Sequence, residues 1–147
     1  MAKFTINRQN VTVTNGNDIL TIVAGAGKRI KLLRCAVTAN GTASGTQNIV
    51  QVARAGTAGA TGGGPLTPQP IFSGAAAAIS VVNTTWTTQP VVSAHAGFAY
   101  NLSSNGAIRT EQWVVEDAIE IAAAENLSIR SISGVTPITV DIEFDEQ

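Results

Sequence analysis

The sequence predicts an all-β protein, an antiparallel sandwich of the jelly-roll kind. Short apolar runs alternate with polar residues, as strands with one buried face require. Gly, Pro and Asn residues separate these runs, and no segment keeps a helical apolar period over three turns. We expect roughly eight to ten short strands from the extended runs given below, and such strands with turn signals every ~8–12 residues are typical of sandwiches and jelly rolls.

The extended runs follow one another along the chain. In order, they are residues 4–6, 11–14, 19–23, 29–39, 47–55, 79–82, 84–88, 91–93, 97–102, 119–121, 127–130 and 138–144. Asn15-Gly16 separates the second run from the third, and both residues tolerate positive φ, so a β-hairpin is predicted there. Residues 56–64 are so rich in glycine that we expect an exposed, mobile loop.

The C-terminal stretch that begins at Trp113 carries the clearest strand pattern. In the last run, Ile138, Val140, Ile142 and Phe144 share one face, and the residues between them are polar. The two runs before it, residues 119–121 and 127–130, alternate in the same way and are bounded by turn-forming residues. This stretch therefore predicts three strands of the core.

The composition suits one domain that assembles with other chains. A chain of 147 residues with 44% hydrophobic content can bury a core of its own. We divide it into an extended N-terminal segment, residues 1–10, and a single jelly-roll domain, residues 11–147. Charged residues make up only 13%, against about 25% in an ordinary soluble domain, which favours a protein that spends its life assembled.

We expect neither a secretion signal nor a membrane partner. No apolar run approaches the ~18 residues of a membrane helix, and the N-terminus has no hydrophobic region of the signal-peptide kind. Residues 1–54 hold seven of the nine basic residues and one acid, Asp18, a bias that nucleic-acid binding would explain. However, no aromatic residue lies among the basic ones. Complementary charge within or between subunits is the preferred interpretation, and no nucleic-acid partner is expected.

No arrangement of residues indicates catalysis. His95 is the only histidine, so a three-histidine metal site would need three symmetry-related subunits; a polar loop position is the alternative. Glu116 and Asp117 are adjacent, so an extended backbone points them to opposite faces rather than into one glycosidase or calcium site. Together with Glu111 and Glu120, they suit a solvated edge. We predict no enzyme activity, no cofactor and no metal.

Three further side chains have both a functional and a structural interpretation. Cys35 is either a reactive thiol or a small buried hydrophobe, and its place in an apolar strand favours the second. Trp86, among threonines, and Trp113, before two valines, are either sugar-binding platforms or buried aromatics, of which the second is the default. A glycan-binding protein would expose one of them on a pocket floor, whereas a purely structural protein would bury both.

The segment WVVEDAIEIAAAENLSIR, followed by SGVTPITVDIEFDE, resembles small structural proteins encoded among the head genes of tailed bacteriophages. These are capsid decoration (cement) proteins, with a jelly roll similar to the tumour-necrosis-factor fold. The resemblance covers residues 113–146, together with size and composition. It implies a non-enzymatic virion protein, made in the host cytoplasm, that binds the outer capsid surface as a homotrimer and contacts the major capsid protein. A carbohydrate- or receptor-binding module of a phage fibre or lectin-like assembly is the alternative.

The trimer interface is assigned to Ile30, Leu32 and Trp113. If residues 29–39 form a regular strand, the first two side chains face one side. A second apolar set then faces the other side: Leu33, Cys35 and Val37. A strand with one face in solvent does not need two apolar faces, so we expect one of them to meet another subunit.

Capsid binding is assigned to Lys3, Phe4, Ile6 and Arg8 in the N-terminal segment. Two interpretations of residues 1–8 stay open. The segment is either an arm that adds to the sheet edge of a neighbouring chain, or an edge strand of its own jelly roll.

Overall fold

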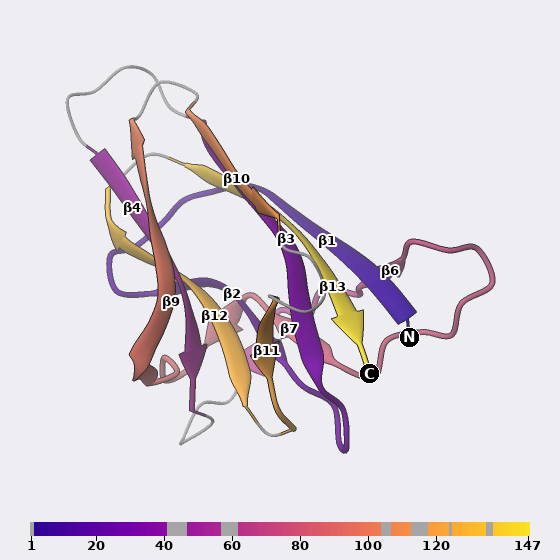
Figure 1. The fold of residues 1–147 in the computed structure, drawn as a ribbon. Coiled ribbons are helices and arrows are strands. Elements are labelled where there is room, and N and C mark those ends of the chain that lie inside the picture. Colours follow the sequence, from indigo (N-terminus) through magenta and orange to yellow (C-terminus); the bar gives the residue numbers. More distant parts are fainter. Residues whose placement is uncertain are drawn as a thin grey trace.

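The structure is a computed structural model that describes residues 2–40, 47–56, 62–103, 107–112, 118–123, 125–134 and 137–147, with backbone alone at residues 62, 93–97 and 103. The strands are β1 (Ala2–Val11), β2 (Asp18–Val23), β3 (Ile30–Ala39), β4 (Gln47–Ala55), β5 (Gly62–Gly63), β6 (Gln69–Pro70), β7 (Val81–Asn83), β8 (Thr85–Trp86), β9 (Val92–Ser103), β10 (Ile108–Gln112), β11 (Ile119–Ile121), β12 (Asn126–Ser133) and β13 (Ile138–Glu146). They form two antiparallel sheets (Figure 1). β5 and β8 form a separate pair. The predicted all-β, sandwich-like fold is confirmed.

The long strands alternate between the two sheets. Sheet A has the order β10-β3-β13-β1-β6, with β11 also paired to β3, and sheet B has the order β7-β2-β12-β4-β9. Successive long strands pass from one sheet to the other, except β4 and β9, which are neighbours in sheet B. The two ends of the described chain meet because β1 lies beside β13 (Figure 1).

The apolar faces of both sheets meet in one core. In β13, the four alternating apolar residues predicted to share a face are all fully buried. Phe144 packs against Phe4 of β1, with ring centroids 5.6 Å apart. Sheet B faces them with Leu20 of β2 and with Leu127 and Ile129 of β12, which are also fully buried. The last three predicted runs are confirmed as β11, β12 and β13, which lie in sheets A, B and A respectively.

A β-bulge in β3 corrects the prediction of two apolar faces. Opposite β3, Glu143 pairs with Arg34 and Phe144 pairs with Leu32, so Leu33 is the extra residue. A bulge resets the alternation of side chains along a strand. The core residues of β3, all at 0% exposure, are Ile30, Leu32, Cys35, Val37 and Ala39. The apolar pattern is therefore explained within one chain and no longer argues for a second, intersubunit face.

β1 belongs to the sheet of its own chain. It pairs with β13 from Ala2↔Glu146 to Val11↔Ile138, and with β6 at Phe4 and Thr5. The alternation predicted for residues 4–6 is present: the apolar side chains are buried and Thr5 between them is half-buried. Of the two interpretations left open for residues 1–8, the described residues 2–8 show the second, a strand in the sheet of their own chain, and pairing with β6 keeps this strand from the very edge.

The hairpin predicted around Asn15-Gly16 is wrong. The turn exists, because Gly16 has a φ of 81° and the Asn17 amide donates to the Thr14 carbonyl at 3.0 Å. The strands on its two sides, however, lie in different sheets, so the turn belongs to a crossover from β1 to β2. Gly16 also donates its amide to the Ser131 carbonyl of β12, at 2.7 Å, which fixes this crossover against sheet B.

The predicted glycine-rich loop is only partly described. Residues 57–61 lie outside the described ranges. Gly62 and Gly63 form the short strand β5 and pair with β8. A side chain at Gly63 would come within 2.9 Å of the Thr85 hydroxyl oxygen, so the missing side chain is what allows this close pairing. Within the described residues, no helix is long and apolar enough to cross a membrane.

Candidate binding pocket

The segment of residues 84–91, here called the covering segment, crosses the outer face of sheet B. Three contacts hold it there: the Trp86 indole Nε1 donates to Thr21 Oγ1 at 3.0 Å, the Gly56 amide donates to the Val91 carbonyl at 3.0 Å, and Gln89 Oε1 accepts from the Asp18 amide at 2.8 Å. The sheet residues beneath it are small: Thr21 of β2, Ser128 of β12 and Ala53 of β4 lie side by side across three neighbouring strands. Small side chains let a second layer of backbone approach a sheet closely.

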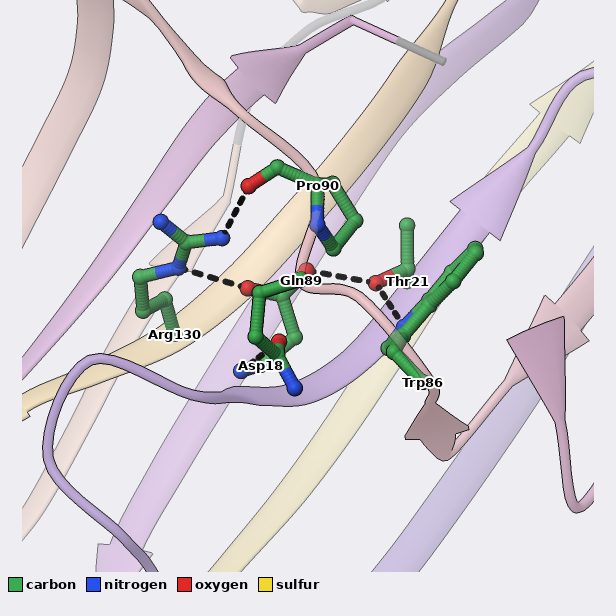
Figure 2. A network of polar contacts seen from close by, with 6 residues as sticks. All are labelled: Asp18, Thr21, Trp86, Gln89, Pro90 and Arg130. Atoms are coloured by element: carbon green, nitrogen blue, oxygen red, sulfur yellow. Dashed lines mark hydrogen bonds and ion pairs between the residues drawn. The ribbon is translucent and has the colours of Figure 1, made fainter. Parts of the chain in front are cut away.

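A buried ion pair lies beneath the covering segment (Figure 2). Arg130 Nε donates to Asp18 Oδ1 at 2.6 Å, and the other carboxylate oxygen accepts from the Thr21 hydroxyl at 2.7 Å. The same guanidinium donates through a terminal nitrogen to the Pro90 carbonyl at 2.5 Å. The Asp18 side chain is fully buried and that of Arg130 is 13% exposed, so each charge depends on its partners rather than on water.

Trp86 is fixed by this network. Its indole nitrogen is bonded to Thr21, whose hydroxyl is in turn bonded to the Asp18 carboxylate. A chain of hydrogen bonds that ends on an ion pair holds the donor in one orientation. The ring itself is half-buried and forms part of the lining of a pocket.

The pocket lies between the crossover from β1 to β2 and the covering segment, and has a volume of about 270 Å³. Part of its lining comes from Arg8 and Val11 of β1 and from the crossover. Four more lining residues belong to the covering segment: Thr84, Thr85, Trp86 and Gln89. Its lining is rich in hydroxyl groups, because Thr12 and Thr14 join the two threonines of the covering segment; Thr12, Thr14 and Thr85 are exposed.

Arg8 is the charged group of this pocket that has no counterion among the residues the structure describes. Its terminal nitrogen donates to the Thr84 carbonyl at 3.2 Å. The ion pairs of the described residues are Arg29–Glu120, Lys31–Glu120, Arg34–Asp141 and Arg130–Asp18, and Arg8 is in none of them. Partial burial lowers the pKa of the Arg8 guanidinium, since it removes water that would stabilise the charge.

A second polar cluster fixes the connection between β6 and β7. The Glu146 carboxylate, at the end of β13, accepts from the amides of Ile79 and Ser80, at 3.1 and 2.7 Å. The Ser80 hydroxyl oxygen accepts from the Gly25 amide at 3.2 Å. Burial alone would raise the pKa of Glu146, but hydrogen bonds from Ser80 and Ile79 and the charge of Lys28 outweigh it, so this pKa is lowered.

Cys35 is a buried residue and not a reactive one, as its strand position suggested. Its side chain is fully buried in the core. Burial raises the pKa of the thiol to about 12, despite the lowering effects of Tyr100 and Arg34. Such a group carries almost no thiolate near neutral pH. The pKa of Tyr100 is also raised by burial, and its hydroxyl donates to the Cys35 carbonyl at 3.4 Å.

The residues assigned to capsid binding are divided between the core and the surface. Phe4 and Ile6 are 1% and 3% exposed, so their side chains pack inside the chain and are not presented to a partner. Lys3 is half-buried and neighbours Asp145 of β13. Only Arg8 lines the pocket.

The residues assigned to the trimer interface are also distributed differently from the expectation. Ile30 and Leu32 are fully buried core residues of β3. Trp113 lies outside the described residues. The pocket brings together Arg8 and Trp86, which the sequence analysis considered for separate roles. The threonines that complete its lining were not predicted.

The remaining candidates do not form a site in the described part of the chain. Glu120 pairs with Arg29 at 2.8 Å, and Glu111 is exposed on β10. Glu116 and Asp117 lie outside the described residues, and at His95 only the backbone of β9 is described. In the described ranges, no three His, Cys, Asp or Glu residues gather as metal ligands.

Comparisons with known proteins add no further assignment. No protein-family model and no curated protein matches the chain.

Proposed function

We propose that this protein is a non-enzymatic structural protein of a tailed-phage virion, which binds the outer capsid surface as a homotrimer. The observation that carries the proposal is the resemblance of residues 113–146 to capsid decoration proteins. The described part of that stretch supplies β12 and β13, which lie inside sheets B and A respectively. The resemblance thus concerns the framework of the fold. A fold alone does not establish a function, so a direct test is needed.

A jelly roll of the tumour-necrosis-factor type is part of this proposal. Support comes from the strand order: β1-β13-β3-β10 in sheet A stands opposite β2-β12-β4-β9 in sheet B. Eight long strands that cross repeatedly between two antiparallel sheets are what two successive Greek keys produce.

Assembly into a trimer is supported by exposed apolar side chains. The connection between β6 and β7, together with the first residue of β7, exposes four of them, between 42% and 62%: Ile71, Phe72, Ile79 and Val81. The connection lies beside the chain termini, where the Ile71 amide donates to the Lys3 carbonyl at 2.9 Å. Large apolar side chains left exposed along one connecting segment are of the kind that a protein–protein contact covers.

Co-sedimentation with phage heads tests the proposal. The purified protein is mixed with expanded heads that lack it, and bound protein is measured after centrifugation. We expect saturable binding in multiples of three copies, together with a higher temperature of head disruption. The absence of binding to expanded heads, or a monomeric mass in solution at micromolar concentration, would contradict the proposal.

A carbohydrate- or receptor-binding function is the second candidate, and one observation favours it. The half-buried Trp86 lines a pocket, which is the arrangement expected of a sugar-binding aromatic residue and not of a purely structural one. Binding of mono- and oligosaccharides to the wild-type protein and to Trp86→Ala tests it. We expect binding that the substitution abolishes; a failure of the wild-type protein to bind any sugar would refute this candidate.

A further inference from the structure

The guanidinium of Arg8 has unused capacity to bind an anion. An arginine side chain carries five N–H donors, and the one hydrogen bond that Arg8 makes to the described residues uses one of them, toward the Thr84 carbonyl. Among the described residues, no carboxylate lies within ion-pair distance of it. A half-buried charge of this kind gains most from a ligand that accepts two parallel hydrogen bonds, and a carboxylate has that geometry.

Asp18, the acidic residue in the pocket lining, does not oppose an anionic ligand. Its carboxylate is fully buried and is neutralised by Arg130 at 2.6 Å. Its second oxygen is occupied by the Thr21 hydroxyl. The pocket therefore presents the positive charge of Arg8 while the negative charge of Asp18 stays paired beneath it.

The rest of the lining suits a sugar ring. The half-buried ring of Trp86 is fixed through Thr21, and a fixed aromatic face can pack against the C–H groups of a pyranose without further loss of freedom. Hydroxyl groups of Thr12, Thr14 and Thr85 can exchange hydrogen bonds with sugar hydroxyls. The volume of about 270 Å³ lies just below the ~300–1,000 Å³ typical of sites for drug-sized ligands, so it suits a single sugar unit.

We propose that this pocket binds one acidic sugar residue, of the uronic-acid class, with Arg8 on its carboxylate and Trp86 against its ring. The proposal rests on the second function above, sugar binding, and is independent of capsid attachment. It names the class of sugar that this pocket would select: one that carries a carboxylate, as part of an acidic polysaccharide.

Calorimetry and ligand-observed NMR with three probes test this assignment. The probes are glucuronate, glucose and sodium acetate, each titrated into the wild-type protein at constant ionic strength. Four proteins are compared: wild type, Arg8→Gln, Arg8→Lys, and Arg109→Gln as the matched control. Arg109 lies on β10 at the opposite edge of sheet A from β1, and it is exposed.

The expected result is selective binding of glucuronate. Glucose and acetate should each bind at least about tenfold more weakly, because each lacks one half of the recognised chemistry. Arg8→Gln should weaken the binding of glucuronate by about tenfold or more. Arg8→Lys should weaken it by less, since lysine keeps the positive charge but cannot donate the two parallel hydrogen bonds of a guanidinium. Arg109→Gln should bind as wild type does. Thermal melting of each variant shows that the fold is kept, and the lysine variant preserves a donor for the Thr84 carbonyl.

Three outcomes would overturn the inference. Equal affinity for glucose and glucuronate would leave sugar binding in place and remove the acidic specificity. Equal affinity for acetate and glucuronate would show a carboxylate site without sugar recognition, as expected for an acidic side chain of a partner protein. No binding of any probe would overturn the acidic-sugar assignment; the sugar-binding function would then be judged by the wider set of mono- and oligosaccharides, and capsid attachment by co-sedimentation.

Discussion

Replacing Asp18 by asparagine is expected to destabilise the protein by about 3 kcal/mol, at the lower end of the ~3–5 kcal/mol that follows the loss of one partner from a buried ion pair. The carboxylate accepts from Arg130 Nε at 2.6 Å and from Thr21 Oγ1 at 2.7 Å, and an amide keeps one acceptor only. The lower end applies because Arg130 is 13% exposed and keeps its hydrogen bond to the Pro90 carbonyl. For a domain of this size, the change corresponds to a fall of roughly 6–12 °C in Tm.

Urea unfolding followed by circular dichroism measures the effect, with an unchanged m-value showing that the folded state stays compact. Asp141→Asn is the matched control, because Asp141 pairs with Arg34 on the surface, where both side chains are about one-third exposed. Exposed pairs contribute about 0–1 kcal/mol. If the two substitutions cost the same within about 0.5 kcal/mol, the buried pair does not contribute more to stability than an exposed one, which would contradict its role in holding the covering segment.

Three further outcomes follow from individual groups. The pKa of Glu146 is lowered by folding, so its stabilising contribution is complete above its unfolded pKa of about 4.3 and is lost as pH falls through the lower folded value. The difference in unfolding free energy between wild type and Glu146→Gln, measured with urea from pH 6 to pH 3, should therefore become smaller as the pH falls. A difference that stays constant would contradict this. Gly134→Ala should destabilise the protein by several kcal/mol, because Gly134 has a φ of 111° and an added Cβ would lie 2.8 Å from the Cα of Asn48. Gly16→Ala should cost only about 1–2 kcal/mol, because Gly16 has a φ of 81° but no atom lies within 4 Å of an added Cβ. Equal losses of Tm in the two variants would refute the steric reasoning. Cys35, with its pKa raised to about 12, should react with a thiol reagent at pH 8 only as fast as the protein unfolds, and rapid modification of the native protein would contradict its burial.

The strands could be predicted from the sequence because side-chain alternation is a local signal. The alternation in β13 reports directly which side chains face the core, since its neighbours β3 and β1 continue the same face. The bulge at Leu33 could not be predicted in this way. An apolar residue in an apolar strand gives no sign that it is the extra one, and only the register with β13 shows it.

The path of the chain between sheets was the least predictable part. Asn15-Gly16 specifies a turn, and the same turn serves a hairpin or a crossover, depending on which strands bury more apolar surface together. One weak feature of the sequence indicates that a segment covers sheet B. The β12 strand carries three polar residues that are buried: Asn126, Ser128 and Ser131. Small polar residues on the second face of a buried strand indicate that something packs over that face.

The pocket combines residues that are far apart in the sequence. Trp86 stands out as an aromatic among threonines, and Arg8 stands out only as one of seven basic residues in the first 54. Their proximity comes from the fold, in which β1 and the covering segment line the same pocket and the Arg8 guanidinium donates to the Thr84 carbonyl. A missing counterion is a property of the folded chain, so no sequence pattern reveals it.

Electron cryomicroscopy of phage heads with and without this protein is the most direct test of the proposed function. The decoration hypothesis predicts added density on the outer capsid surface, with three copies of the two-sheet domain around each threefold position. Density confined to a fibre or tail, or heads that are identical with and without the protein, would contradict it.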